Sequence, residues 1–235
     1  MRSGVLFLVG MFLVVGASFA QNKTSEKDKN AKSPIYWLYD AHYRMAIQYN
    51  DYDEAKSALY NLIILDPKND SLRYNLSYLY FDAGKYPSTI MACRDILALN
   101  PNHLGALELS GTSYENLGIK DKALIDYEKL YMASSSIYSL YKMAFLQFDL
   151  KKYAECNVNV DILLENTELV NARVEFSAAN NTSKEYPMKV AVLNLKGLVN
   201  KELGNKDIAK KAFEDAMAIV PDFEQAKINL AEINK

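Results

Sequence analysis

The sequence predicts an all-α protein, a right-handed α-solenoid of about five stacked helix pairs with a capping helix at the C-terminal end. Two observations support this prediction. The stretch 70–103 contains two apolar stripes of helical spacing, which Gly84 separates and Pro101 ends. In addition, its small, aromatic and proline residues return about 34 residues before and after it. Copies of one helix pair are expected to stack, because a single pair cannot bury its apolar face.

Numbering 70–103 as positions 1 to 34 aligns the other copies on the same positions. Glycine or asparagine at position 15 marks a turn in most copies, and small residues at positions 8 and 20 let the two helices approach closely. Gly111 and Gly197 both fall at position 8, where we expect a facing helix to leave no room for a side chain. The predicted repeats are 36–69, 70–103, 104–136, 137–170 and 190–223.

This spacing resembles the tetratricopeptide repeat (TPR), which carries Leu, Gly, Tyr, Ala, Phe and Pro at fixed offsets. The last repeat shows it at positions 8, 15, 20, 24, 27 and 32 with Gly197, Gly204, Ala209, Phe213, Ala216 and Pro221. The resemblance covers most of the chain after residue 35. It implies a concave groove lined by the first helix of each pair, and a protein or peptide as the partner.

The second helix of each pair has a marked start. Pro87 stands in the first turn of its helix, where a missing N–H group is harmless. Asp53, Asp121 and Asp207 stand at the same point of their repeats, and we expect their carboxylates to be N-caps.

The first 20 residues have the features of a secretory signal peptide. Arg2 precedes an apolar run over 5–15, and small residues at Ser18 and Ala20 mark a cleavage site after Ala20. An uncleaved anchor is the alternative, but the run is short for the roughly 20 apolar residues of a membrane-spanning helix. We therefore expect an exported protein, periplasmic in a bacterium, without stable membrane insertion after cleavage of residues 1–20.

The segment 21–33 is polar and rich in Lys and Asn, so it is predicted to be a flexible leader before a TPR domain over 34–235. Losing Arg2 with the signal leaves 27 − 1 = 26 Lys and Arg against 29 Asp and Glu. A chain so close to neutral, and slightly acidic, gives no basic surface that favours nucleic acid.

An insertion over 171–189 interrupts the repeats. Polar and apolar residues alternate along 173–177, a turn sequence follows, and Pro187 limits any second strand to an edge. We predict a short β-hairpin or an ordered loop between repeats 4 and 5. After the last repeat, 224–235 matches only a first helix and is expected to be the capping helix.

The residue inventory does not favour an enzyme. Nearly all glycines are used by the signal, the turns or the close-packing positions, and His42 and His103 have no metal-binding spacing. Cys93 and Cys156 occupy core positions two repeats apart, so we expect both to be buried, reduced and too distant for a disulfide. The sequence thus predicts no catalytic, cofactor or metal site.

The resemblance implies that positions 2, 5, 9, 12 and 13 of the first helices face the partner. Repeats 2 and 4 carry aromatic residues at these positions, and repeat 3 carries polar and acidic ones. The predicted partner-binding residues are Tyr74, Tyr78, Phe81, Asp82, Glu108, Thr112, Glu115, Tyr138, Tyr141, Phe145 and Phe148.

The sequence is compatible with two functions. The first is a non-enzymatic scaffold that binds a peptide or partner protein of the cell envelope in an aromatic-lined groove. The second is a structural spacer or assembly factor, whose aromatic face is sealed by the insertion 171–189 or by self-association. The carboxylate clamp of chaperone cofactors is excluded, because only Asn75 matches among its five positions.

Overall fold

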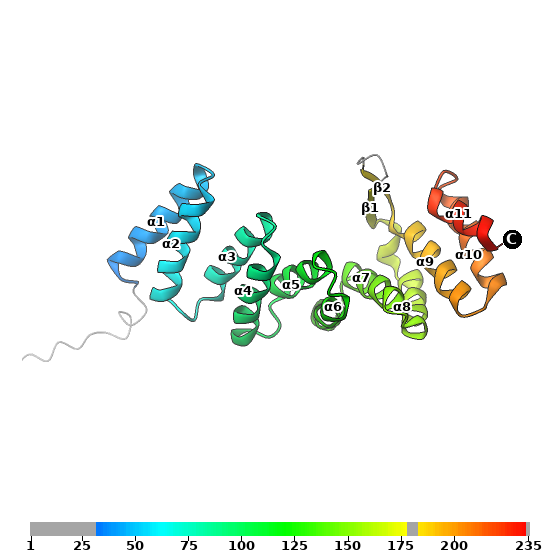
Figure 1. The fold of residues 1–235 in the computed structure, drawn as a ribbon, viewed down its shortest axis with the longest axis horizontal. Coiled ribbons are helices and arrows are strands. Elements are labelled where there is room, and N and C mark those ends of the chain that lie inside the picture. Colours follow the sequence, from blue (N-terminus) through cyan, green and yellow to red (C-terminus); the bar gives the residue numbers. More distant parts are fainter. Residues whose placement is uncertain (1–31, 178–182, 234–235) are drawn as a thin grey trace, which may run out of the picture.

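The computed structural model describes residues 32–177 and 183–233. These residues form an elongated solenoid of antiparallel helix pairs, with one strand pair near the C-terminal end (Figure 1). The predictions for the signal peptide 1–20 and for most of the leader 21–33 lie outside the described residues. Within the described ranges, no helix combines the length and the apolar character that crossing a bilayer requires.

Five helix pairs follow one another along the chain, and we name them repeats 1 to 5. They are α1 (Pro34–Gln48) with α2 (Tyr52–Leu65), α3 (Asp70–Asp82) with α4 (Tyr86–Leu99), α5 (Leu104–Asn116) with α6 (Lys120–Ser134), α7 (Ile137–Asp149) with α8 (Tyr153–Glu165), and α9 (Met188–Glu202) with α10 (Lys206–Ile219). The second helix of each pair also contacts the first helix of the next. A final helix, α11 (Glu224–Ile233), packs on α9 and α10.

Every turn inside a pair uses the left-handed backbone region at position 15. The φ angles there are 57° at Asn50, 67° at Gly84, 72° at Gly118, 59° at Lys151 and 82° at Gly204. Glycine adopts this conformation without the steric cost that a Cβ atom brings. The positive φ angle therefore explains why glycine recurs at the end of the first helix. In repeat 4, Lys151 adopts the same backbone conformation.

Close packing at position 8 is confirmed in repeats 3 and 5. A Cβ atom added at Gly111 would lie 3.1 Å from Cε2 of Tyr127, and one added at Gly197 would lie 2.3 Å from Cε1 of Phe213. Both aromatic rings belong to the second helix of the same pair and are buried. The missing side chain is what allows each ring to reach the facing helix.

The insertion contains the predicted hairpin. After a short 3-10 helix at Thr167–Val170, strands β1 (Arg173–Ser177) and β2 (Ser183–Pro187) pair antiparallel. Its apolar side is anchored, because Phe176 and Tyr186 both contact Phe223, with ring centroids 5.6 and 5.1 Å away. The hairpin is thus fixed against the junction between α10 and α11.

The predicted N-caps are wrong by two residues. Asp51 caps α2, since its Oδ1 accepts the Glu54 N–H at 3.2 Å, while Asp53 lies within the first turn. Asp121 and Asp207 likewise lie in the first turns of α6 and α10. These carboxylates face the positive end of the helix dipole, which explains why acidic residues recur there.

Ser33 Oγ accepts the Tyr36 N–H at 3.3 Å and caps α1, so the solenoid includes the last residue of the predicted leader.

Cys93 and Cys156 are buried and not bridged, as expected. Burial raises the pKa of both thiols to about 12.

Candidate functional site

A groove of about 590 Å³ opens on the middle of the solenoid, between repeats 3 and 4 and strand β1. It is lined by Leu104, Glu108, Thr112, Tyr127, Leu130, Ser134, Ser136, Tyr138, Ser139, Tyr141, Lys142, Arg173, Val174 and Glu175. The volume lies within the range of sites that hold small molecules or short peptide segments. Helices α5, α6 and α7 therefore supply the floor and one wall, and β1 supplies another.

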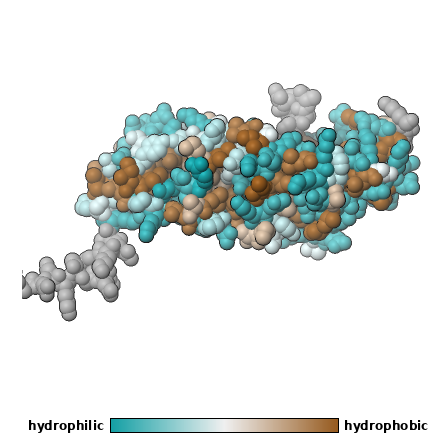
Figure 2. All heavy atoms as spheres, turned by 60° about the horizontal axis from the view of Figure 1, so that its bottom comes forward, coloured by the Kyte–Doolittle hydropathy of each residue, from teal (hydrophilic) through white to brown (hydrophobic). Residues whose placement is uncertain are grey.

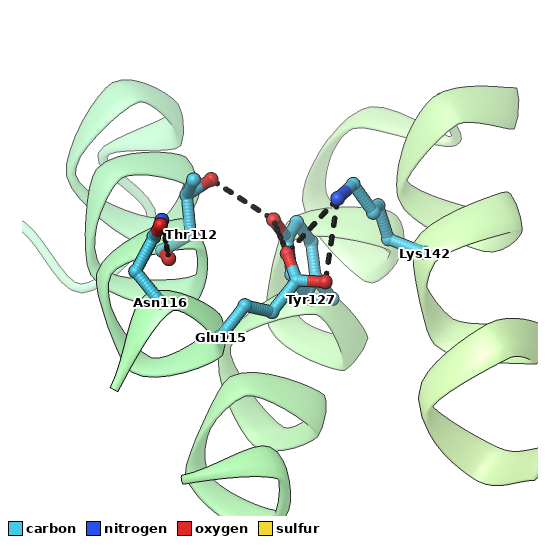
Figure 3. A network of polar contacts seen from close by, with 5 residues as sticks. All are labelled: Thr112, Glu115, Asn116, Tyr127 and Lys142. Atoms are coloured by element: carbon cyan, nitrogen blue, oxygen red, sulfur yellow. Dashed lines mark hydrogen bonds and ion pairs between the residues drawn. The ribbon is translucent and has the colours of Figure 1, made fainter. Parts of the chain in front are cut away.

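A polar network lies at the groove floor (Figure 3). The Tyr127 hydroxyl donates to Glu115 Oε2 at 2.7 Å, and Lys142 Nζ donates to the same oxygen at 3.0 Å. Since Tyr127 has one hydroxyl hydrogen, the Thr112 hydroxyl, 3.0 Å away, is the donor to the Tyr127 oxygen. The network joins α5, α6 and α7 and fixes the side chains on which a ligand would rest.

Burial is the main reason that the pKa of Tyr127 is raised, and the negative charge of Glu115 raises it further. Burial and Glu115 act in the same direction on the pKa of Tyr141. Both phenols therefore stay neutral at physiological pH, and Tyr127 keeps the hydrogen that it donates to Glu115. The floor therefore offers hydrogen-bonding groups that are held in place by one another.

The walls of the groove carry exposed aromatic and charged groups. Tyr138 is 53% exposed, while Tyr141, on the same helix, is partly buried. Glu108 on α5 and Arg173 on β1 have no ion-pair partner among the described residues. Glu108 and Arg173 thus place an unpaired negative and an unpaired positive charge on two different elements of one groove. A ligand that carries both a basic and an acidic group could form an ion pair with each.

Residues 190–230, which contain most of α9, all of α10 and most of α11, match the family model of the tetratricopeptide repeat. The fold is a TPR solenoid. Solved structures show the same fold over most of the chain. A TPR protein from Parabacteroides merdae is 19% identical with a TM-score of 0.62, and the match covers 84% of this chain and 72% of that one.

Two further TPR-like neighbours have similar scores. YrrB, described as a TPR protein with an unusual peptide-binding site, is 13% identical with a TM-score of 0.65 and covers 86% of this chain and 93% of its own. MamA is 15% identical with a TM-score of 0.61 and covers 78% of this chain and 90% of its own. None of the curated proteins compared matches the chain. Identities this low establish the fold alone.

Four residues predicted from the TPR groove positions line the observed groove. They are Glu108, Thr112, Tyr138 and Tyr141. Glu115 acts from beneath, through its bonds to Tyr127 and Lys142. The polar floor expected from repeat 3 is therefore present, and the aromatic wall expected from repeat 4 is present at its first two positions.

The aromatic residues of repeat 2 do not reach this groove. Tyr74 lies over the start of α5, where a Cβ atom at Gly105 would be 2.5 Å from its hydroxyl and where its ring is 5.0 Å from that of His103. Phe81 packs against Tyr86, with ring centroids 5.9 Å apart. Their side chains serve the contacts between helices, because Gly105 of repeat 3 leaves room for Tyr74, and Tyr86 on the second helix of the same repeat offers a ring to Phe81.

Tyr78 and Asp82 are exposed but lie outside the groove lining. Phe145 and Phe148 are also outside it, because both pack against the core around α7 and α8. Phe145 contacts the Tyr141 ring at 4.7 Å, and Phe148 contacts Tyr153 at 5.6 Å. The helical positions of repeat 4 thus divide into two groove residues and two packing residues.

The groove also contains residues that the TPR positions do not predict, from the second helix α6, from strand β1 and, with Lys142, from another position of α7. The ring of Tyr127 packs against Gly111, and its hydroxyl belongs to the groove floor. Lys142 and the β1 residues Arg173 and Glu175 were not assigned to the groove. The alternation along 173–177 contained a signal, since alternate residues of a strand that covers helices must face away from them.

His103 has a structural position. Its Nδ1 accepts the Ala106 N–H at 3.1 Å, which makes it the N-cap of α5. Over residues 32–177 and 183–233, no group of three or more His, Cys, Asp or Glu side chains is arranged to hold a metal ion.

Proposed function

We propose that the protein is a non-enzymatic scaffold that binds a peptide segment of a partner protein in the groove between repeats 3 and 4 and β1. The observation that carries this proposal is the composition of the groove. It combines half-exposed Tyr138 with the unpaired charges of Glu108 and Arg173 above a rigid hydrogen-bonded floor. Aromatic side chains beside oriented polar groups are typical of surfaces on which a few residues supply most of the binding energy.

The fold supports the same conclusion. A TPR solenoid is generally an interaction scaffold, and YrrB, which has this fold, is described as having a peptide-binding site. The groove floor also suits a passive binder, because the pKa values of Tyr127 and Tyr141 are raised and their hydroxyls stay protonated. These points favour recognition of a partner over chemistry on it.

The test uses the purified protein and a displayed library of linear dodecapeptides. We expect enrichment of peptides whose binding is weakened about tenfold or more by Tyr138→Ala. The matched control is Tyr78→Ala, because Tyr78 is also 53% exposed on the first helix of a repeat but lies outside the groove. Equal losses in the two variants, or no enrichment at all, would reject the proposed site.

The insertion does not support the version of the structural alternative in which it seals the aromatic face. Phe176 and Tyr186 cover Phe223 near α11, and Tyr138 remains half-exposed. Self-association has an observation in its favour, because α1 exposes Leu38 and Met45. Figure 2 shows hydrophobic patches on the surface at one end of the solenoid. Sedimentation at increasing protein concentration tests it, and a monomer at all concentrations excludes it.

Export is part of the proposal and rests on residues 1–20 alone. The apolar run and the small residues before Gln21 support cleavage after Ala20 in a periplasmic protein. The N-terminal sequence of the protein from its own cells tests this proposal. Gln21 as the first residue is the expected result, and full-length protein in the membrane fraction contradicts it.

A further inference from the structure

The hydrogen bonds of the hairpin determine which backbone groups of β1 face its partner strand. The Met188 N–H donates to the Ala172 carbonyl oxygen at 2.9 Å, immediately before the pair Arg173↔Pro187. In an antiparallel pair, hydrogen-bonded and non-hydrogen-bonded residues alternate along each strand. Val174 therefore directs its N–H and C=O groups toward β2, and Arg173 directs its own toward the opposite edge.

The position of Pro187 agrees with this alternation of hydrogen-bonded and non-hydrogen-bonded pairs. A proline has no N–H group, so it is tolerated in a strand only where that group would not take part in the ladder. It stands opposite Arg173, at a non-hydrogen-bonded pair. Two independent features of the hairpin thus place the backbone groups of Arg173 at the outer edge of β1.

The outer edge of β1 lies at the groove. Arg173, Val174 and Glu175 line the groove, whereas no residue of β2 does. The sheet has only these two strands within the described ranges, so no strand follows β1 on that side. An edge strand with outward backbone groups is a template for pairing with another extended segment.

We propose that the peptide binds as a third strand, paired with the outer edge of β1 through the backbone of Arg173. This inference rests on the proposed function and adds the conformation of the ligand to it. Strand addition to an exposed sheet edge is a general mode of peptide recognition, in which the main chain supplies affinity and alternate side chains supply specificity. The proposed ligand is therefore extended rather than helical.

The groove also specifies the side chains of the added strand. Successive residues of a strand point to opposite faces, so every second side chain enters the groove beside Tyr138 and Leu130. The charges predict an acidic residue near Arg173 and a basic residue that reaches Glu108, since neither has a partner among the described residues. The ligand is thus an extended peptide of alternating pattern with charges of both signs.

The experiment uses the dodecapeptide most enriched by the display selection, synthesised with a single backbone N-methyl group at each position in turn. N-methylation removes one N–H group and leaves the side chain in place. We expect losses of affinity of about tenfold at alternate positions of the bound stretch, with little change between them. A loss at consecutive positions, or at none, overturns strand pairing while the proposed function stands.

Two variants of the protein test the backbone N–H group of Arg173, which is the proposed hydrogen-bond donor to the peptide. Arg173→Ala removes the side chain and keeps the N–H, whereas Arg173→Pro also removes the N–H that points away from β2. We expect Arg173→Pro to bind the peptide several-fold more weakly than Arg173→Ala, with equal melting temperatures. Equal affinities would overturn the proposal. If Arg173→Pro unfolds, binding of the N-methylated peptides to the unchanged protein decides whether the peptide pairs as a strand. Failure to enrich any peptide rejects both this inference and the proposed function.

Discussion

Repeats 3 and 5 solve the same packing problem with different side chains. In each, a glycine at position 8 lets an aromatic ring at position 24 of the second helix reach the first helix. In repeat 5 the ring is Phe213, which is completely buried. In repeat 3 it is Tyr127, whose hydroxyl binds Glu115 and Thr112 at the groove floor.

Position 23 shows the same contrast. Repeat 5 buries Ala212 there, whereas repeat 3 buries Asp126, and Oδ2 of Asp126 has no hydrogen-bond partner. Repeat 3 thus keeps the packing of a TPR unit and adds polar atoms to it. The comparison indicates that a binding surface arises on this scaffold by changing the ends of packed side chains, while the packed part stays constant.

The strongest test of the shared packing is Gly197→Leu. A Cβ atom there would already lie 2.3 Å from a fully buried ring, so the larger side chain must displace Phe213. We expect a loss of about 3 kcal/mol in the free energy of unfolding, measured by urea denaturation. An unchanged midpoint would show that position 8 of repeat 5 tolerates a side chain. Gly111→Leu is the comparison, with a smaller loss because the contact with Tyr127 is looser.

Phe213→Tyr tests whether repeat 5 accepts the polar atom that repeat 3 uses. The new hydroxyl would enter an apolar cluster that contains Val190, Leu193 and Phe223. A buried hydroxyl without a partner is expected to cost about 2 kcal/mol, again measured by urea denaturation. A neutral result would mean that the hydroxyl reaches a polar group or water, and that the two repeats differ less than their sequences indicate.

Asp126→Ala makes position 23 of repeat 3 resemble that of repeat 5. Burial is the main cause of the raised pKa of the Asp126 carboxyl, and a hydrogen bond from Ser110 and the charges of Lys129 and Lys122 only partly oppose it. A raised pKa in the folded state means that the protonated form stabilises the fold. That contribution is complete below the ordinary pKa of 3.8 and is lost as the pH rises through the folded pKa.

The variant should therefore be more stable than the natural protein at neutral pH, by about 1 kcal/mol. The gain should shrink as the pH falls towards the ordinary pKa of an aspartate. Thermal unfolding of both proteins between neutral and acidic pH measures it. A gain that does not depend on pH would exclude the carboxyl charge as its cause.

Tyr127→Phe is the smallest change, and it removes only the hydroxyl that distinguishes Tyr127 from Phe213 of repeat 5. Glu115 keeps its ion pair with Lys142, so the loss in stability should be about 0.5 kcal/mol. Peptide affinity should fall as well, because Glu115 and Thr112 lose a fixed partner. A loss of stability as large as that of Gly197→Leu would show that the hydroxyl belongs to the core and not to the groove.

Much of the fold follows from the sequence because TPR packing is local. Gly84, Gly118 and Gly204 mark turns that need a positive φ angle, and Gly111 and Gly197 mark contacts within one helix pair. Such features depend on residues a few positions apart in the chain. The alternation along 173–177 predicted a strand for the same reason.

The groove was less predictable because it depends on how separate elements meet. Tyr74 and Tyr141 both stand at position 5, yet Tyr74 lies over Gly105 and Tyr141 lines the groove. The difference comes from the neighbouring repeat in the first case and from β1 in the second. Lys142 joins the floor only because its partner Glu115 lies on another repeat, 27 residues away. No period in the sequence encodes these relations.

The two buried cysteines allow local opening of the solenoid to be measured by thiol labelling. Cys93 and Cys156 belong to different core clusters, and their thiols have pKa values of about 12. A thiol reagent reacts with the thiolate, so both sites should be inert until the surrounding helices separate. Because repeat proteins can open locally, the labelling rate at each cysteine then gives the free energy of opening of its own part of the chain. A ligand in the groove should slow labelling at Cys156 more than at Cys93, which allows binding to be detected without modifying the groove.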